Sequence, residues 1–359
     1  MPSPLRVAIV GGGQIARTAH MPAFRQLPGQ VEVVAVVDAT AELAAAFAES
    51  WGLPYHSADL EGTLAAVKPD LVAIASPPAL HATQVAAALR SGAWVWCEKP
   101  PCLSLAEYDA MIAGEQDGGP YAAIVFQQRF GSAARHARQL ISTGALGTPY
   151  VAHCQTTWYR DPDYYAVPWR GKWATEGGGP AMGLGIHQMD LMLELLGEWT
   201  EVRAMAGRLA RDIETDDVTT ALVRFASGAM ATVVNTSLAP RQVSHIRIDL
   251  ADGTLELSHL YGYANADWTF TPAPHASEKA WDPPAEDVPS SHLTQLRGLV
   301  ADLRAGRRPR ASGQDSRRSL ELITAMYKAA LTGQSVRAGE IGPGDPFYES
   351  MHGGRSDLL

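Results

Sequence analysis

The chain has 359 residues, more than a single hydrophobic core usually accommodates, and this length predicts two domains. Its composition, 46% hydrophobic and 19% charged, is that of an ordinary globular protein, and its net charge of -9 arises without an acidic run. Such a balance argues against a nucleic-acid or anionic-membrane partner. It is compatible with small neutral or weakly anionic substrates.

The cysteines and the N-terminus indicate the compartment. Cys97, Cys102 and Cys154 form neither an even disulfide set nor a close-spaced zinc pattern, so we expect reduced thiols and no metal centre. Strand-like sequence begins within about five residues of the start, and no uncharged apolar run approaches membrane-spanning length. The sequence therefore predicts a cytoplasmic protein without a membrane segment.

Short apolar runs alternate with helical segments in the first third of the chain. Buried parallel strands are expected at Leu5–Val10, Val31–Asp38, Asp70–Ala75 and Trp94–Cys97. Helices are expected between them, at Ile15 to about Leu27, Ala39–Trp51 and about Leu80–Ser91. This alternation is typical of an α/β Rossmann domain with a doubly wound parallel sheet, which we assign to residues 1–122.

Beyond Tyr121 the pattern changes to longer segments in which apolar and polar residues alternate. They predict strands at Tyr150–Tyr159, Val202–Leu209, Val218–Phe225, Met230–Thr236 and Ile246–Leu250. Thr269–Pro289 is expected to be an irregular loop, followed by helices at about Ser291–Ala305 and Asp315–Thr332. Residues 123–359 are thus predicted to form an α+β domain with a large, mostly antiparallel sheet. Its open face predicts a homodimer or homotetramer, because sheet-on-sheet packing between subunits would cover it.

A glycine-rich turn follows the first strand. Gly11 would permit the tight turn and Gly13 the close approach of a pyrophosphate, while the helix N-terminal amides of Gln14 and Ile15 would face the phosphates. The second strand ends in Asp38, which is suited to bind a ribose diol, and no arginine follows it to hold a 2'-phosphate. The sequence favours NAD over NADP; a purely structural glycine turn is the alternative.

Glu98-Lys99-Pro100 ends the fourth strand of the same domain. Hydride transfer from a carbinol carbon also requires loss of the hydroxyl proton, so the pocket needs a base that returns this proton in reduction. Lys99 could serve if partial desolvation lowers its pKa, and as an ammonium it would polarise a carbonyl oxygen. A surface lysine at a strand end is the alternative, and we expect Pro100 to fix the direction of Lys99, with a cis peptide bond as one option.

His187 begins a helix expected over about Gly185–Leu196 and follows a run of glycines that lets backbone approach a ligand. A core or capping histidine is its other interpretation. Asp190, one turn on, could orient the imidazole or stabilise the first turn of the helix.

Aromatic and basic residues gather after the first strand of the second domain. Aromatic faces stack on the C–H faces of sugar rings, and arginine and tyrosine donate hydrogen bonds to hydroxyl groups. The preferred carbohydrate-binding set is Tyr159, Arg160, Trp169 and Arg170. A loop packed against the sheet or against a subunit neighbour is the alternative.

The order of several motifs resembles one known family almost from end to end. The chain carries Gly11-Gly12-Gly13-Gln14-Ile15-Ala16, Ser76-Pro77-Pro78-Ala79-Leu80-His81, Glu98-Lys99-Pro100, Gln127-Gln128-Arg129-Phe130, Trp169-Arg170-Gly171, Gly177-Gly178-Gly179, Gly185-Ile186-His187-Gln188-Met189-Asp190 and Ser312-Gly313-Gln314-Asp315. In this order they resemble the Gfo/Idh/MocA oxidoreductases, which include glucose-fructose oxidoreductase and inositol dehydrogenase.

The resemblance implies a nicotinamide at the carboxyl edge of the parallel sheet and a substrate that is a sugar, a cyclitol or a keto derivative. It implies that His187 faces the substrate and that Lys99 is catalytic. The remaining implied contacts are Ser76, Pro77 and His81 along the cofactor groove, Glu98 and Lys99 at the nicotinamide ribose, Gln127 near the nicotinamide, and Trp169 and Arg170 at both cofactor and substrate.

Gly183 departs from the pattern, because many members of this family carry an aspartate four residues before the histidine. Either Lys99 and His187 suffice for proton transfer, or the substrate makes different demands, or dehydrogenase activity has been lost. The leading hypothesis is an NAD-dependent sugar or cyclitol dehydrogenase or keto-sugar reductase. One alternative is a redox-neutral enzyme whose tightly bound NAD is reduced transiently, and another is a non-catalytic sugar-sensing regulator.

Overall fold

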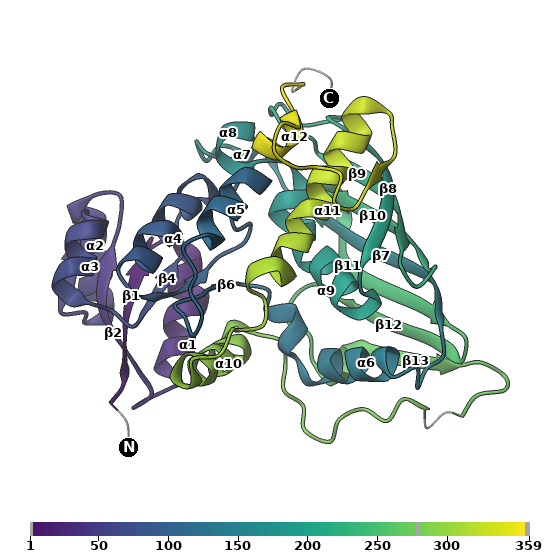
Figure 1. Ribbon diagram of the computed structural model, residues 1–359, viewed down its shortest axis with the longest axis horizontal. Helices are drawn as coiled ribbons and strands as arrows, with labels where there is room; N and C mark the ends of the chain where they lie inside the picture. The colour runs from purple at the N-terminus through teal and green to yellow at the C-terminus, as the bar shows by residue number, and fades with distance from the viewer. Residues whose placement is uncertain (1–2, 278–279, 356–359) are drawn as a thin grey trace. The chain divides into compact units, whose positions relative to one another are not determined.

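Residues 3–277 and 280–355 are described by a computed structural model, in which the chain forms two compact units (Figure 1). Unit 1 takes the chain up to Cys102, Ala106–Val125 and His292–Arg317, and unit 2 takes Leu103–Leu105, Phe126–Ser291 and Arg318 onward. The units therefore differ from a single division after residue 122. The chain returns to unit 1 at His292, and no local sequence pattern predicts this return.

Unit 1 is built on a parallel sheet of strand order β3-β2-β1-β4-β5-β6, as expected for a doubly wound fold. The strands are β1 Leu5–Val10, β2 Val31–Val37, β3 Tyr55–Ser57, β4 Leu71–Ile74, β5 Trp94–Cys97 and β6 Ala122–Ile124. The helical elements are η1 Ala16–His20, α1 Met21–Arg25, α2 Ala41–Trp51, α3 Leu60–Val67, η2 Pro78–Leu80, α4 His81–Arg90, α5 Leu105–Ile112 and α10 His292–Ala305. The helix expected from Ile15 thus contains a π-helical segment, η1, before α1.

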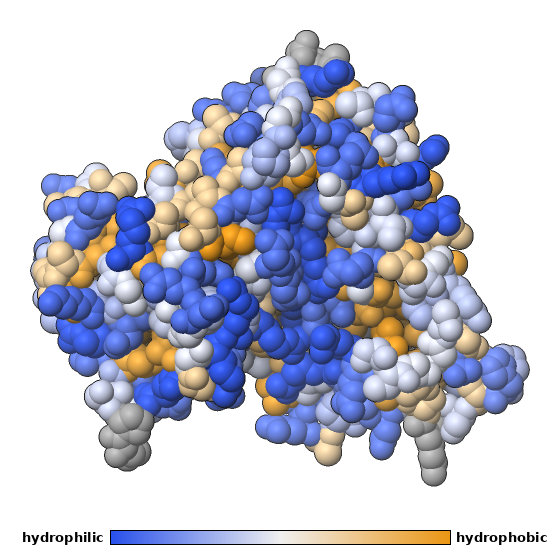
Figure 2. Space-filling view, viewed as in Figure 1, coloured by the Kyte–Doolittle hydropathy of each residue, from blue (hydrophilic) through white to orange (hydrophobic). Residues whose placement is uncertain are grey.

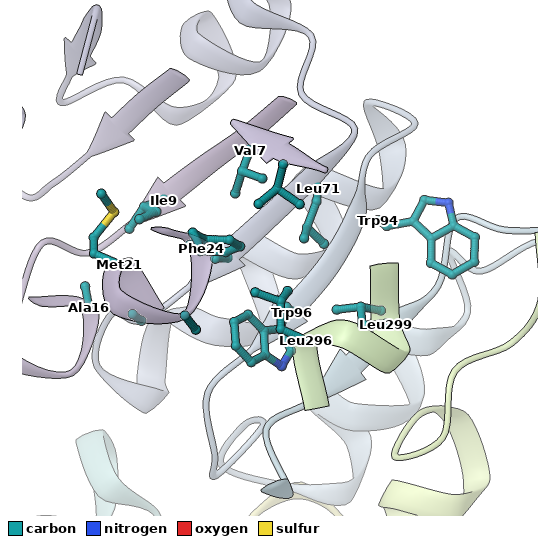
Figure 3. Packing of buried hydrophobic residues seen from close by; sticks show 14 of the residues in the cluster. Val7, Ile9, Ala16, Met21, Phe24, Leu71, Trp94, Trp96, Leu296 and Leu299 are labelled. Atoms are coloured by element: carbon teal, nitrogen blue, oxygen red, sulfur yellow. The ribbon is translucent and has the colours of Figure 1, made fainter. Parts of the chain in front are cut away.

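The core of unit 1 joins the sheet to helices from both ends of the chain. Val7 and Leu71 project from β1 and β4, and Trp96 from β5 packs in the same cluster as Leu296 and Leu299 of α10 (Figure 3). All five side chains are at most 3% exposed. Burying a side chain of this size contributes about 1.5–3 kcal/mol, so α10 is an integral part of this unit.

Unit 2 contains a mixed sheet of order β13-β12-β11-β7-β10-β9-β8-β14. Its neighbouring strands are antiparallel except β7 and β10, which confirms a mostly antiparallel sheet. The strands are β7 Pro149–Tyr159, β8 Trp199–Gly207, β9 Val218–Phe225, β10 Met230–Thr236, β11 Leu238–Leu250, β12 Gly253–His259, β13 Trp268–Pro272 and β14 Val336–Arg337. The prediction of a loop over Thr269–Pro289 is wrong at its start, because β13 pairs with β12 there; the part of the loop at residues 278–279 lies outside the described residues.

Helix α9, Ile186–Leu196, is buried along its whole length and contacts β7 and β11 of the sheet. The other helical elements of unit 2 are η3 Gln127–Phe130, α6 Ser132–Ser142, α7 Pro162–Tyr165, α8 Trp173–Glu176, η4 Ala181–Gly185, η5 Asn265–Asp267, α11 Gly313–Thr332 and α12 Pro346–Glu349, with the first turn of α11 belonging to unit 1. Inward residues such as Cys154 and Val233 alternate with more exposed ones such as Leu222, which is 61% exposed. One face of the sheet is therefore open in the single chain.

On the face of the molecule seen in Figure 2, hydrophobic residues are interspersed with hydrophilic ones. Among the described residues, no helix combines the length and the apolar character that crossing a bilayer requires.

Candidate functional site

The glycine turn of unit 1 is dictated by close backbone packing. Gly11 has φ +91°, and a Cβ there would lie 2.7 Å from the backbone nitrogen of Ser76, so only glycine fits. A Cβ on Gly12 would lie 2.9 Å from Oδ2 of Asp38. A Cβ on Gly13, in contrast, would meet no described protein atom within 4 Å, so packing within the chain does not account for that glycine.

Asp38 lies directly after β2, beside this turn. Its Oδ2 accepts a hydrogen bond from the Gly12 amide at 2.8 Å, and its Oδ1 accepts one from the Ala39 amide at 2.7 Å. The carboxylate is thereby fixed while each oxygen retains a further lone pair for a ribose hydroxyl. Nearby, the Arg17 guanidinium donates to Gly12 O at 3.1 Å and to Ser50 Oγ at 3.0 Å, and no sequence motif indicated this basic group beside the turn.

His81 ties the ends of two strands together. Its Nδ1 lies 2.8 Å from Pro100 O and its Nε2 lies 2.8 Å from Ser76 O, and the side chain is 1% exposed. Burial lowers the pKa of His81 despite the two carbonyl oxygens, which favour the charged form. The structure thus places His81 beneath the loops that carry Ser76 and Lys99, with both ring nitrogens directed at backbone.

Glu98 lies in a buried cluster with two histidines. Its Oε1 accepts from Nε2 of His20 at 2.8 Å and from Nε2 of His292 at 2.9 Å, and its Oε2 lies 3.3 Å from the Lys99 amide. The carboxylate is 6% exposed. Burial alone would raise the pKa of Glu98, but the hydrogen bonds and charges of the two histidines outweigh it and hold this pKa well below its usual range.

Lys99 begins the turn after β5, and its peptide bond to Pro100 is cis, which confirms the option stated from the sequence. The Glu98 carboxylate anchors the backbone on the N-terminal side of Lys99, and His81 anchors Pro100 on the other side. The backbone that carries the lysine is therefore held from both directions.

In unit 2, Gln127 and His187 meet at one further residue. The Gln127 amide nitrogen donates a hydrogen bond to the hydroxyl of Tyr261, and the Tyr261 ring centroid lies 5.8 Å from that of His187. Phe126 packs edge-on against the same imidazole at 6.4 Å. Gln127 and His187 are 1% and 4% exposed.

Asp190, one turn after His187, accepts two 2.5 Å hydrogen bonds from the Arg129 guanidinium. Ser319 donates to the same carboxylate at 2.8 Å, and Glu194 accepts from Arg129 at 3.3 Å. The Asp190 carboxylate thus belongs to a buried ion pair that ties η3, which contains Gln127, to α9, and its role in orienting the imidazole stays a prediction.

The aromatic and basic residues after β7 form one cluster around Tyr164. The guanidinium carbons of Arg160 and Arg170 lie 5.1 and 3.9 Å from the centroid of its ring, and Arg170 also lies 4.3 Å from that of Trp169. Tyr159, at the end of β7, is 41% exposed. The cluster thus presents stacked cation–π pairs next to an exposed aromatic residue.

A small pocket adjoins this cluster. Its lining includes Tyr164, Glu176, Gly183 and Thr215, and a Cβ on Gly183 would meet no described atom within 4 Å. Glu176 is 8% exposed; its Oε2 accepts from the Gly171 amide at 2.5 Å, and its Oε1 lies 3.2 Å from Arg170 Nη1. The Glu176 carboxylate thus lines the same pocket as Gly183, the position at which many relatives carry an aspartate.

Within unit 1 the structure gathers Gly11, Gly13, Gln14, Ile15, Asp38, Ser76, Pro77 and Lys99 at or just after the carboxyl ends of β1, β2, β4 and β5. Within unit 2 it gathers Gln127 and His187 around Tyr261, and it gathers Arg160 with Trp169 and Arg170 around Tyr164. The Tyr159 ring instead lies 5.3 Å from the guanidinium carbon of Arg211. Sequence reasoning missed His20, His292, Tyr261 and Glu176. The sequence offered only their residue types as a signal. Their place in the site depends on contacts with residues that are distant in the chain, which no local pattern reveals.

Two family models match most of the chain. Residues 5–121 match "Oxidoreductase family, NAD-binding Rossmann fold", and residues 134–256 match "GFO/IDH/MocA C-terminal domain". D-apiose dehydrogenase of Paraburkholderia graminis is 30% identical over 97% of this chain and 93% of its own.

Solved structures agree with this assignment. The WlbA dehydrogenase of Bordetella pertussis, in complex with NADH and UDP-GlcNAcA, is 27% identical with a TM-score of 0.81, covering 93% of this chain and 98% of its own. The aldose-aldose oxidoreductase of Caulobacter crescentus, complexed with glycerol, is 28% identical with a TM-score of 0.81, covering 93% and 99%. The chain belongs to the Gfo/Idh/MocA family of oxidoreductases and carries its NAD-binding Rossmann domain.

Proposed function

We propose that this oxidoreductase transfers a hydride between NAD and a hydroxyl-bearing or keto carbon of a sugar, a sugar derivative or a cyclitol. One observation carries the proposal: Asp38 is fixed by the Gly12 amide beside a turn that only Gly11 can make, while Lys99 lies two residues after the end of β5 in the same sheet. The relatives support the substrate class, since they include a D-apiose dehydrogenase and an aldose-aldose oxidoreductase.

The residues around the turn fit a dinucleotide. Asp38 would bind the ribose diol, and Gly13 would leave room for the pyrophosphate opposite the amides of Gln14 and Ile15. Ser76 and Pro77 would border the groove, and Gln127, Trp169 and Arg170 are retained as proposed cofactor contacts. NAD, when bound, supplies the hydride acceptor. An acidic Asp38 favours NAD over NADP, because a 2'-phosphate would be repelled.

Lys99 and His187 are the proposed acid/base residues. In oxidation the substrate loses a hydride from carbon and a proton from oxygen, and one of these two side chains takes the proton; in reduction the same group returns it. For Glu98 and His81 we propose that they position Lys99, because their polar atoms are directed at His20, His292 and backbone. Tyr159, Arg160, Trp169 and Arg170 are the proposed sugar-binding set.

The test is a panel of sugars and cyclitols with NAD and NADP, in which the absorbance of the reduced cofactor is followed. On a confirmed substrate, Lys99→Ala and His187→Ala are each expected to lower kcat about 100-fold or more. A control, Lys68→Ala, removes a lysine at the C-terminal end of α3, outside the proposed site. Wild-type turnover in both site variants would refute the catalytic assignment.

A second candidate is a redox-neutral enzyme that keeps NAD bound and reduces it only transiently. Purified protein that releases stoichiometric NAD and converts a glycoside without net NADH would support it. A third candidate, which the missing carboxylate at Gly183 keeps open, is a non-catalytic sugar-sensing regulator; it predicts sugar binding without any chemical change.

We further propose that the protein is cytoplasmic and forms a homodimer or homotetramer through the open face of the unit 2 sheet. Its three cysteines are buried and form no disulfide among the described residues, as suits a reducing compartment. Leu222 and Met205, which are 61% and 76% exposed, lie on paired strands and would be covered in such an assembly. A monomer in sedimentation at micromolar concentration would refute it.

A further inference from the structure

Tyr261 lies in the loop between β12 and η5, and no motif of the sequence marked it. Its hydroxyl accepts a hydrogen bond from the Gln127 amide. Its ring centroid lies 5.8 Å from His187, at an interplanar angle of 72°, and 6.2 Å from Trp158 of β7. One side chain thus contacts two residues of the proposed site and an aromatic residue of the sheet.

The exposure of these residues differs in a way that suits ligand contact. Gln127 and His187 are almost fully buried, whereas Tyr261 is 42% exposed. Tyr261 therefore presents a partly open aromatic surface at the place where the buried imidazole and amide come together. Trp158 extends this surface, and Trp158 Nε1 donates to Ser244 Oγ at 3.0 Å, which fixes the indole ring.

The polar geometry of Tyr261 also limits what its hydroxyl can do. Because the phenolic oxygen accepts from Gln127, its own proton must be directed elsewhere. The other end of the Gln127 amide, Oε1, is buried without a hydrogen-bond partner among the described residues. A buried amide oxygen of this kind is usually satisfied by a donor.

We propose that Tyr261 binds the substrate directly: its hydroxyl donates a hydrogen bond to a substrate oxygen beside His187, and its ring forms with Trp158 an apolar wall for one face of a sugar ring. This inference rests on the proposed function, because it places the carbohydrate of that reaction against His187. Tyr261 in this position supplies a polar group for the substrate oxygen in a chain that lacks a carboxylate at Gly183.

Tyr261→Phe tests the hydroxyl while keeping the ring, and Tyr150→Phe is the matched control, because Tyr150 is 55% exposed at the start of β7. The proposal expects Tyr261→Phe to lower kcat/KM at least about tenfold on a substrate of the wild type, with NADH affinity unchanged. Tyr261→Ala, which also removes the ring, should raise KM further. Equal kcat/KM for Tyr261→Phe and Tyr150→Phe would overturn the proposal.

A double-mutant cycle that combines Tyr261→Phe with His187→Asn measures whether the two effects on kcat/KM are coupled. A merely structural role of Tyr261 would not produce such coupling. If Tyr261 and His187 act on the same substrate oxygen, their effects on kcat/KM are non-additive, whereas additive effects would overturn the shared contact. Circular dichroism of each variant checks that it is folded.

Sugar binding separates this inference from the proposed reaction. The sugars of the panel are added to full-length protein with NADH, and the shift in melting temperature is measured. A sugar that binds the wild type without turnover would refute the proposed function, and loss of its shift in Tyr261→Phe would still support the role of Tyr261. Binding that Tyr261→Phe and Tyr261→Ala leave unchanged, or binding of no sugar to the wild type, would overturn the inference.

Discussion

Nε2 of His292 lies 2.9 Å from Oε1 of Glu98, although the two residues are 194 positions apart in the chain. His20 donates to the same oxygen at 2.8 Å. The carboxylate just before Lys99 is thus held by the start of the chain and by a helix from its last quarter.

Removing one of these donors should destabilise unit 1. We expect His292→Ala to lower the free energy of unfolding by about 2 kcal/mol, because a buried carboxylate loses a charge-assisted hydrogen bond. Urea unfolding of the full chain measures the change. His275→Ala is the control, since His275 is largely exposed, and equal stability of the two variants would contradict the role of His292.

Acid should weaken the fold through its buried histidines. Burial lowers the pKa of His81 below 6.5, so the unfolded chain binds more protons than the folded one, and stability falls as the pH drops below about 6.5. His20, whose pKa burial also lowers, acts in the same direction from the same pH downward, and Glu98, whose pKa is depressed, acts in this direction at lower pH. Asp216 opposes them, because burial raises its pKa to about 6.

His81→Gln isolates one contribution. The wild type should be more stable than this variant by about 1 kcal/mol at pH 7.5, and the difference should shrink toward pH 5, because only the wild type must take up a proton at this position on unfolding. Melting temperatures measured across this range test the prediction. A difference that stays constant with pH would show that His81 is not the titrating group.

Gly183 and Gly185 lie in the same π-helical segment but differ in the space around them. A Cβ on Gly185 would lie 1.8 Å from Oδ1 of Asn235, so Gly185→Ala should cost about 3 kcal/mol of stability. Gly183→Ala should be close to neutral, because its Cβ would meet no described atom within 4 Å. Chemical unfolding of the pair gives the comparison, and similar losses in both would contradict it.

Gly183→Asp tests whether the missing carboxylate at this position limits the rate of the reaction. If Lys99 and His187 alone limit proton transfer, the added carboxylate should raise kcat several-fold on a substrate of the wild type, since general acid/base groups contribute about 100-fold or more when well placed. Gly183→Asn, of the same shape but without charge, is the control. An equal rise with asparagine would show that charge is not the cause.

Asp38 should decide between the two nicotinamide cofactors. Asp38→Asn removes the charge while keeping an acceptor for the Gly12 amide, so NADH affinity should fall about tenfold while NADPH affinity rises. Arg17, bound to Gly12 O and Ser50 Oγ, is the basic side chain on which a 2'-phosphate could then depend. Fluorescence titration with both cofactors measures the ratio, and an unchanged ratio would contradict the assignment of Asp38.

Elements with strong local periodicity could be predicted from the sequence. The bounds of β1, β9 and β10 agree with the expected ranges, because an apolar run or a strict alternation fixes a strand wherever it packs. The short β3 and the strand β13 were missed, since three residues carry no period and the prolines after Trp268 resemble a loop. The helix after Gly13 was predicted without its π-helical segment η1. In such a segment the backbone hydrogen bonds span one residue more than in an α-helix, and the apolar pattern does not show this change.

The candidate site divides in the same way. Gly11 and Asp38 could be identified because the glycine turn and the strand end lie within one strand-helix-strand unit. The partners of Glu98 could not, because nothing near His20 or His292 shows that α10 packs on β5. Asp190 was placed beside His187 by helix periodicity, but the guanidinium that binds it comes from η3, and such pairing depends on tertiary structure alone.

The return of residues His292–Arg317 to unit 1 sets an order of events during synthesis. A ribosome that has released the first 125 residues has supplied the whole parallel sheet, but not Leu296, Leu299 or His292, which complete its core and its buried carboxylate cluster. The nascent nucleotide-binding unit therefore lacks the contacts of α10 with Trp96 and Glu98 until most of unit 2 has been translated.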